Sequence, residues 1–261
     1  MAFYQHWLTR FVLRKDFLRR AKMRLQLYSR RLQKDEFDDL GLLLDQPKTI
    51  FDCGANIGFV THEFRKRFPS ATVYAFEPNP VVFAPLERTF AADPKVRAIS
   101  KGISRAPGRT VFNQNANSGT SSLYEATSYN RSHWARKATQ IEVELTSIDS
   151  FTSAEGITSI DVLKLDLEGA ELDALVGAER LISQQKIDVI YTEVAIVPLY
   201  KDQALLEDLT LHLRTKGYHL YNIYGFNESA IRQAILGNAT FVSTRFREQL
   251  KQRWGDAQCG W

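Results

Sequence analysis

The sequence contains few cysteines and no long apolar run. Its two cysteines, Cys53 and Cys259, provide neither a disulfide framework nor a zinc cluster. No stretch reaches the roughly 18–20 apolar residues that cross a bilayer. The basic start of the chain also lacks the cleavage site and the apolar core of a secretory signal, which is roughly 7–15 residues long. We therefore expect a reduced, cytoplasmic protein without a membrane-spanning helix.

The composition is that of an ordinary globular protein. Hydrophobic residues make up 44% of the 261 positions and charged residues 25%, which excludes a disordered or low-complexity chain. A chain of this length can bury a full hydrophobic core. The sequence therefore predicts one large α/β domain with an appendage, or two small domains.

Positive charge is concentrated at the start of the chain. Residues 1–34 hold ten Lys and Arg against one acid, Asp16, whereas the remainder holds 24 basic and 29 acidic residues. Apolar residues recur within this stretch at helical spacing: Phe3, Trp7, Phe11, Leu18, Leu25 and Tyr28. We expect residues 1–45 to form a basic amphipathic helical extension. Its apolar side packs on the body or forms a homodimer, or the helix lies on the inner face of an anionic membrane; nucleic acid is a third partner, which the acidic body disfavours.

From residue 46 onward, apolar strands alternate with helices, which predicts a mostly parallel sheet covered on both faces. The predicted strands are 48–53, 71–76, 96–100, 161–166, 187–193, 218–223 and 239–243, and the predicted helices are 57–68, 80–91, 169–182 and 205–216. We assign 46–245 to this domain and 246–261 to a polar C-terminal tail. Residues 101–140 are rich in Ser, Asn, Gly and Thr, with short strands at 110–112 and 141–145, and are expected to form a long lid or substrate loop.

Acidic residues follow four of the predicted strands. Asp52 ends the first strand, Glu77 follows the second, Asp166 ends the fourth and Glu193 ends the fifth. In an open α/β sheet, ligands bind beyond the carboxyl ends of the strands. We therefore expect these acids to surround the ligand site.

The first turn is rich in glycine but is not a dinucleotide fingerprint. Its pattern is Asp52-x-Gly54-x-x-x-Gly58, whereas the fingerprint G-x-G-x-x-G admits a pyrophosphate. Asp52 would attract an ammonium group, although it could instead bond a turn amide; Gly54 would let a ligand approach closely, and Gly58 would let the helix pack on the strand. Glu77 is placed to accept hydrogen bonds from ribose hydroxyls. The pattern fits S-adenosylmethionine, a nucleoside that carries a cationic amino acid and no phosphate, with Asn56 and Asn79 as further contacts.

Two runs of this sequence resemble a known family. Residues 50–58 and 75–80 look like the cofactor half of a class I S-adenosylmethionine-dependent methyltransferase. Residues 146–151 and 160–171, with the run Lys164-Leu-Asp-Leu-Glu-Gly-Ala-Glu171 as the most specific part, are similar to the FkbM family of methyltransferases. The resemblance covers about residues 48–225. It implies a Rossmann-like fold with a seven-stranded sheet whose last strand is antiparallel, and methyl transfer, usually to a hydroxyl of a sugar or natural product.

Several residues are candidates for the chemistry of methyl transfer. A sugar hydroxyl benefits from a general base or a metal. Asp166, Glu168 and Glu193 are the candidate bases, and the same acids are the candidate ligands of Mg²⁺. The alternative for Glu168 is to cap the helix after Gly169.

Other polar residues have weaker assignments. Glu171 falls in the first turn of that helix and is expected to be structural. Lys164 is expected to pair with one of the acids or to bind a substrate oxygen. His133 is either a base carried by the lid or a solvated side chain, and residues 117–122 either contact a polyhydroxylated acceptor or form a flexible turn.

The leading hypothesis is O-methylation of a saccharide, glycolipid or natural product with S-adenosylmethionine. Two alternatives are methylation of another nucleophile, such as an amide or RNA, and a non-catalytic binding or assembly module with the same fold. The intact set of glycines and acids argues against the non-catalytic version.

Overall fold

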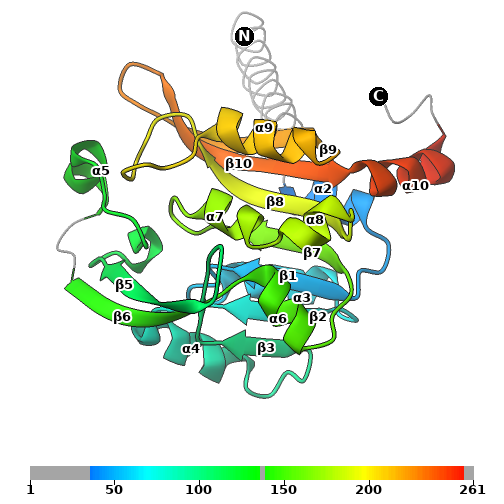
Figure 1. The fold of residues 1–261 in the computed structure, drawn as a ribbon, viewed down its shortest axis with the longest axis horizontal. Helices are drawn as coiled ribbons and strands as arrows, with labels where there is room; N and C mark the ends of the chain where they lie inside the picture. Colours follow the sequence, from blue (N-terminus) through cyan, green and yellow to red (C-terminus); the bar gives the residue numbers. More distant parts are fainter. Residues whose placement is uncertain (1–35, 136–138, 256–261) are drawn as a thin grey trace, which may run out of the picture.

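The computed structural model describes residues 36–135 and 139–255, and a seven-stranded sheet forms its centre (Figure 1). The strand order is β3-β2-β1-β7-β8-β10-β9. The strands are β1 (Thr49–Cys53), β2 (Thr72–Phe76), β3 (Val96–Ile99), β7 (Ile160–Leu165), β8 (Ile187–Ala195), β9 (Tyr218–Glu228) and β10 (Ala234–Ser243). The pairs β1–β2, β1–β7, β2–β3 and β7–β8 are parallel, whereas β10 runs antiparallel to β8 and β9. The expected mostly parallel sheet with an antiparallel last strand is confirmed.

Helices cover both faces of this sheet because successive side chains of its buried strands point to opposite sides. One hydrophobic cluster joins Phe51, Leu163 and Ile190 to the helices α6 (Ile148–Ala154), α7 (Glu171–Val176), α8 (Glu179–Ser183) and α9 (Leu206–Thr215). A second cluster joins the neighbouring residues Ile50 and Val162 to α2 (Glu36–Leu43), α3 (Phe59–Arg67) and α10 (Thr244–Trp254). The helix α4 (Pro80–Phe90) packs beside β2 and β3 in a third.

The segment expected to be a long irregular lid is largely regular. It contains β4 (Gly102–Ile103), β5 (Gly108–Gln114), the 3₁₀ turn η1 (Ser118–Thr120) and α5 (Ser128–His133), and β6 (Thr139–Thr146) follows. The strands pair in the order β4-β6-β5 as a second sheet. The expected short strands are confirmed, but His133 ends a helix and does not lie in an irregular loop.

Two further expectations differ from the structure. The predicted helix 169–182 is broken into α7 and α8 at Gly177, because the Asp149 carboxylate accepts hydrogen bonds from the amides of Arg180 and Leu181 and so starts a new helix. The expected polar tail begins with α10, which contributes buried Phe246 and Leu250 to the core.

The predicted extension over residues 1–45 falls mostly outside the described residues. Its last part is α2, which is tied to the sheet because Glu36 accepts a hydrogen bond from Tyr191 at 3.1 Å and Asp39 accepts one from Tyr224 at 2.8 Å. Within the described ranges, no helix combines the length and the apolar character needed to cross a bilayer.

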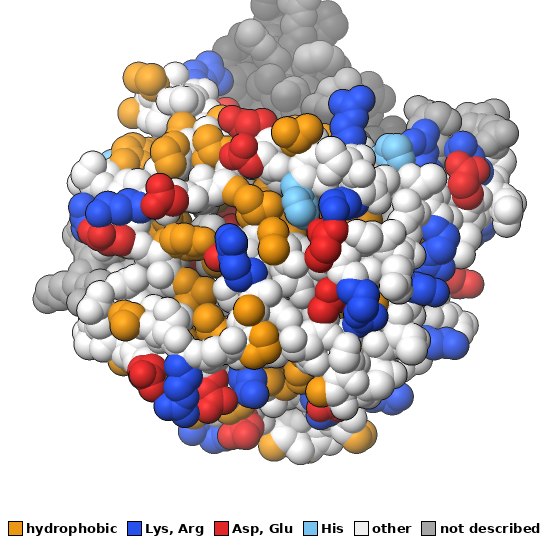
Figure 2. All heavy atoms as spheres, viewed as in Figure 1, with side chains coloured by type: hydrophobic (Ala, Val, Ile, Leu, Met, Phe, Trp, Pro, Cys, Tyr) orange, Lys and Arg blue, Asp and Glu red, His pale blue; other side chains and the backbone are white. Residues whose placement is uncertain are grey.

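The face of the molecule that carries α6 to α9 has a mixed surface. Figure 2 shows acidic and basic side chains interspersed over this face, without a field of one sign. On this face, for example, Arg180 lies 3.7 Å from the oppositely charged Asp149. This face therefore lacks the positive stripe by which proteins bind a polyanion.

Candidate functional site

A cavity lies at the carboxyl ends of β1, β2 and β7. Five of the predicted site residues line it together: Gly54, Asn56, Glu77, Asp166 and Glu168. The other predicted residues do not line it: Asp52, Gly58, Asn79, His133, Lys164 and Glu193.

Glu77 holds the first two loops together from a nearly buried position. Its carboxylate accepts hydrogen bonds from the amide of Asn56 at 2.9 Å and the amide of Asn79 at 2.7 Å. Burial raises the pKa of Glu77 to about 7, although these two amide bonds lower it. Asn79 in turn caps α4 by accepting from the amide of Val81, and it accepts from Gln114 at 2.8 Å. Each oxygen of Glu77 keeps a free lone pair for a ligand donor.

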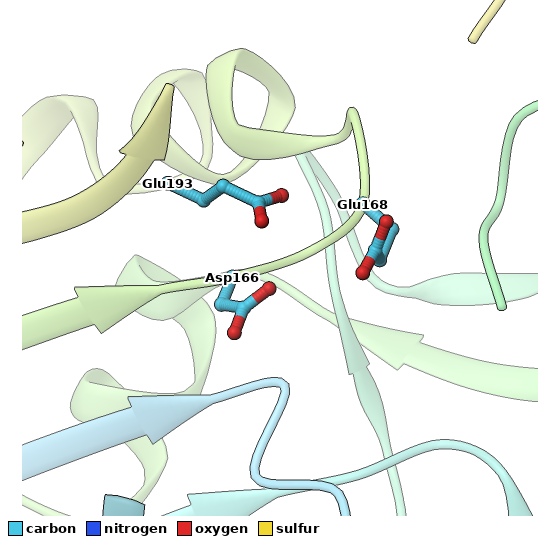
Figure 3. A group of neighbouring side chains, drawn as sticks. All are labelled: Asp166, Glu168 and Glu193. Atoms are coloured by element: carbon cyan, nitrogen blue, oxygen red, sulfur yellow. The ribbon is translucent and has the colours of Figure 1, made fainter. Parts of the chain in front are cut away.

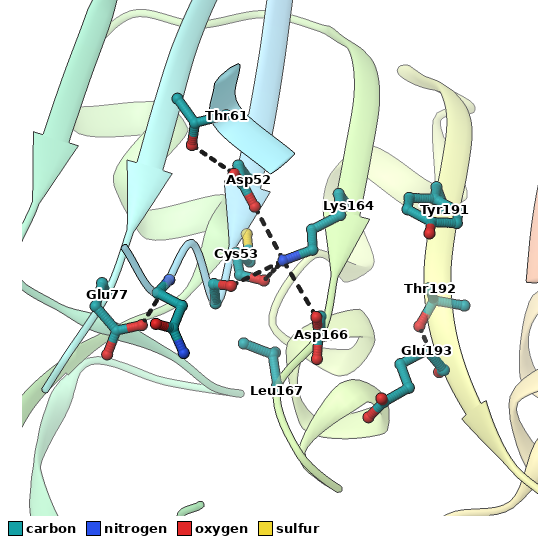
Figure 4. Close-up of polar contacts among 12 residues, drawn as sticks. Asp52, Cys53, Thr61, Glu77, Lys164, Asp166, Leu167, Tyr191, Thr192 and Glu193 are labelled. Carbon is teal, nitrogen blue, oxygen red and sulfur yellow. Dashed lines mark hydrogen bonds and ion pairs between the residues drawn. The ribbon is translucent and has the colours of Figure 1, made fainter. Parts of the chain in front are cut away.

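Asp52 and Lys164 form a buried ion pair next to the first turn (Figure 4). Asp52 is fully buried; it accepts a hydrogen bond from Thr61 at 2.6 Å and lies 3.0 Å from the Lys164 ammonium. Lys164 also donates to the Gly54 carbonyl at 2.8 Å and lies 3.6 Å from Asp166. Burial alone would lower the pKa of Lys164, but the carboxylates of Asp52 and Asp166 raise it. Lys164 thus pairs with acids, as one of its two expected roles requires, and Asp52 faces Lys164 and Thr61 instead of the cavity.

The two glycines of the first turn serve packing inside the protein. Gly54 has φ +80°, and a Cβ there would overlap the carbonyl oxygen of Asp166. Gly58 has φ +98°, and a Cβ there would lie 2.6 Å from the ring of Phe90 on α4. On the side where a Cβ would stand, the group that approaches Gly54 closely is therefore the loop after β7. Gly58 allows α4 to pack closely, whereas the sequence pattern predicts that it lets its own helix pack on the strand.

Three carboxyl groups gather at the ends of β7 and β8. Figure 3 shows Glu193 reaching from β8 toward Asp166 and Glu168, and one oxygen of each lies within 4.8 Å of the others. Burial raises the pKa of Glu168 and of Glu193 well above the usual value, and the neighbouring carboxylates add to the shift. Like charges at this separation favour the uptake of a proton or a cation.

The alternative role of Glu168 as a helix cap is not observed, since the N-cap of α7 is Ala170 without a side-chain cap; Glu171 instead holds the turn before the helix. The buried Glu171 carboxylate accepts hydrogen bonds from the amides of Leu167 at 2.7 Å and Gly169 at 3.1 Å, in the turn that precedes α7. Glu168 has φ +52°, a left-handed conformation that few residues other than glycine adopt. Glu168 precedes α7, and its side chain lines the cavity.

Sequence reasoning missed Tyr200. Its hydroxyl lies 2.6 Å from a Glu168 carboxyl oxygen and 3.0 Å from the carbonyl oxygen of Thr120. Tyr200 follows β8 in a segment without the glycine turn or strand-end acid that marked the other site residues. It also lies 32 residues from Glu168, so no local sequence pattern connects the two.

Residues 114–122, here named the strap, form one wall of the cavity. Ser118, Gly119 and Ser121 line it, and Ser122 donates a hydrogen bond to the Glu168 carbonyl at 2.6 Å. Ser118 also lies 3.4 Å from the Asn56 side chain. Part of the polar run 117–122 thus lines the cavity, where contact with an acceptor, one of its two expected roles, would place it.

His133 lies apart from the cavity. Its exposed ring stacks on Tyr129 with centroids 4.3 Å apart, and its Nδ1 lies 2.7 Å from the Tyr129 carbonyl oxygen. The structure therefore does not bring His133 to the acids.

The chain is similar to known proteins across the residues that build this cavity. A family model described as the methyltransferase FkbM domain matches residues 52–220. The 2-O-methyltransferase NoeI of Sinorhizobium fredii is 28% identical over 170 residues, with 62% of this chain and 69% of that protein covered. The hexuronic acid methyltransferase AglP of Haloferax volcanii is 27% identical over 165 residues, with 62% and 63% covered. A crystal structure of a methyltransferase FkbM from Methylobacillus flagellatus is 19% identical with a TM-score of 0.49, and the match covers 76% of this chain and 45% of that one.

Proposed function

The chain belongs to the FkbM methyltransferase domain family, and on this premise we propose that it is an S-adenosylmethionine-dependent O-methyltransferase. The acceptor in this proposal is a hydroxyl of a saccharide, glycolipid or related natural product. Two relatives support it by name, since one is a 2-O-methyltransferase and the other a hexuronic acid methyltransferase.

The observation that carries the proposal is the acidic lining of the cavity. Glu77, Asp166 and Glu168 line the cavity, and burial already raises the pKa of Glu77 to about 7. A ligand with hydroxyl donors and positive charge would stabilise these carboxylates, whereas a phosphate would not. We assign Glu77 to the ribose hydroxyls, with Gly54 and Asn56 supplying main-chain contacts. Asn79 contributes indirectly by capping α4, and Asp52 and Gly58 stabilise the first turn through contacts inside the protein.

The chemistry asks the protein to orient a hydroxyl and accept its proton. Bound S-adenosylmethionine would supply an electrophilic methyl group, and Gly54, Asn56 and Glu77 would hold it. Glu168 or Glu193 takes the hydroxyl proton, because a raised pKa makes a carboxylate a better base near neutral pH. Lys164 holds Asp166 and the first turn in place through its ion pair and its hydrogen bond to the Gly54 carbonyl. His133 is an alternative base only if α5 moves toward the acids.

Binding of a divalent cation is the competing role for the same acids. Oxygens of Asp166, Glu168 and Glu193 lie within 4.8 Å of one another, and Mg²⁺ prefers carboxylate oxygens. Chelation separates the two roles: loss of transfer that Mg²⁺ restores would favour the metal, and unchanged transfer would favour the base.

The test is transfer of labelled methyl from S-adenosylmethionine into crude glycan, lipid and RNA fractions. Label in glycan or glycolipid supports the proposal, and label in RNA alone replaces it with the alternative nucleophile. Calorimetric titration with S-adenosylhomocysteine addresses the non-catalytic alternative, which predicts no measurable binding.

The basic extension bears on the location and the assembly of the enzyme in the cell. We propose a cytoplasmic protein whose residues 1–34, with ten basic side chains, form a homodimer or bind the inner face of an anionic membrane. Residues 1–35 lie outside the described part of the chain. Sedimentation with anionic vesicles at low and high salt, for the full chain and for a chain starting at residue 35, distinguishes the two outcomes.

A further inference from the structure

Tyr200 lies where the acid cluster, the turn after β7 and the strap meet. The residue is 1% exposed, yet its hydroxyl is within hydrogen-bond distance of Glu168 and of the Thr120 carbonyl. We propose that Tyr200 is a positioning residue, which holds the Glu168 carboxyl group for proton transfer and fixes the strap to the same point. This inference rests on the proposed function, because it assigns Glu168 the work of the base.

Glu168 needs such a partner because its carboxyl group lies beside two other acids. Its backbone is in a left-handed conformation, and its carboxyl neighbours Asp166 and Glu193 repel an ionised carboxylate. Among the described residues, Tyr200 is the hydrogen-bond donor to the Glu168 carboxyl group, at 2.6 Å. Without it the side chain would be expected to turn away from the other two acids.

Tyr200 is itself fixed from several sides. Its amide donates a hydrogen bond to the Gln203 side chain at 3.2 Å, and its backbone pairs with Ala126. Its ring packs on the turn, since a Cβ on Gly169 would lie 3.0 Å from the ring. The hydroxyl therefore has a defined position, which a long flexible side chain would not provide.

The hydroxyl has one proton and two acceptors within reach. When Glu168 is ionised, the Tyr200 hydroxyl donates to it; when Glu168 is protonated, the carboxyl group can donate to the hydroxyl, which then donates to the Thr120 carbonyl. Glu168 thus keeps its bond to Tyr200 in both states. One hydroxyl group can serve the carboxyl group and the strap during a proton transfer.

The test replaces only the hydroxyl, with Tyr200→Phe, and uses Tyr218→Phe as the matched control. Tyr218 is equally buried at 1% exposure, but its hydroxyl donates to the Ile187 carbonyl at the opposite ends of the strands. We expect Tyr200→Phe to lower labelled methyl transfer at saturating S-adenosylmethionine by about 10–100-fold, the cost of a misplaced catalytic group. Binding of S-adenosylhomocysteine should change less than about threefold, and amide hydrogen exchange in the strap should become faster.

Three results would overturn the inference. Transfer within twofold of the wild type would show that Glu168 does not need the hydroxyl. An equal loss in Tyr218→Phe would indicate general destabilisation, and an equal loss of S-adenosylhomocysteine binding would place Tyr200 in the cofactor pocket. A wild type that labels no fraction contradicts the proposed function instead, and strap exchange then decides whether Tyr200 fixes the strap.

Discussion

The acids at the ends of β1 and β2, Asp52 and Glu77, have hydrogen-bond or ion-pair partners within the protein; we call this the paired side. At the ends of β7 and β8, Glu168 and Glu193 face other acids; we call this the crowded side. Asp52 is paired with Lys164, and Glu77 accepts two backbone amides. Glu168 and Glu193 have raised pKa values, to which neighbouring carboxylates contribute. The acids of the first side thus have partners within the protein, which suits a preformed binding surface. The second side is short of partners, which suits proton transfer.

The largest expected effect tests the crowded side. Glu168→Gln or Glu193→Gln should lower turnover by about 10²–10⁴-fold if that residue is the general base. Stability should not fall, because each change removes a repelling charge. Labelled methyl transfer measures the loss, S-adenosylhomocysteine binding should stay near normal, and the exposed Glu207→Gln serves as control. Retained activity in both variants would mean that the base lies elsewhere.

Lys164→Met tests the paired side. The change leaves Asp52 buried without its cation, and breaking a buried pair in this way costs about 3–5 kcal/mol of unfolding free energy. Urea unfolding measures the effect, with Lys66→Met as control because that side chain is 71% exposed. The double variant Lys164→Met/Asp52→Asn should recover part of the loss. A stable single variant would show that the pair contributes little.

Gly54→Ala tests whether the first turn is constrained by the protein or by a ligand. A Cβ would overlap the Asp166 carbonyl and add left-handed strain, for an expected cost of about 2–4 kcal/mol without any ligand. Gly156→Ala is the matched control, since Gly156 has φ +67° with open space around it and should lose only about 1–2 kcal/mol. Equal losses in the two variants would rule out the close approach as the constraint.

Glu77→Ala addresses binding on the paired side. The variant should weaken S-adenosylhomocysteine binding by about 1.5–3 kcal/mol, the range for hydrogen bonds to a charged group. Calorimetry measures the dissociation constant, and Glu87→Ala on α4 is a nearby control outside the cavity lining. An unchanged constant in a folded variant would remove Glu77 from the ligand site.

The last expected effect is a pH slope, which is small for each pH unit. Since the folded-state pKa of Glu77 is raised to about 7, the folded protein holds this proton more tightly than the unfolded chain. The free energy of unfolding should therefore fall as the pH rises from about 4.5 to 7, by at most about 1.4 kcal/mol per pH unit for this group. Urea unfolding across this range should show a shallower slope in Glu77→Ala, and an identical slope would contradict the raised pKa.

Local patterning predicted most of the fold. The alternation of apolar strands with helices was sufficient for the parallel sheet, because buried strands and amphipathic helices carry their own periodicity. It did not predict the break between α7 and α8, because Asp149, which starts α8, lies 31 residues before Arg180. Phe246 and Leu250 were read as part of a polar tail because two apolar residues among charges give a weak helical signal.

The sequence by itself determined which acids end the strands, since Asp52, Glu77, Asp166 and Glu193 follow apolar runs whose ends meet at one edge of the sheet. Only the tertiary structure decided what each acid faces. Asp52 turned to Lys164 on the neighbouring strand, Glu77 to two loop amides, and Glu168 to Tyr200 from 32 residues away. The physical reason is that the electrostatics of a carboxylate depend on partners a few ångströms away, and those partners come from segments distant in the chain.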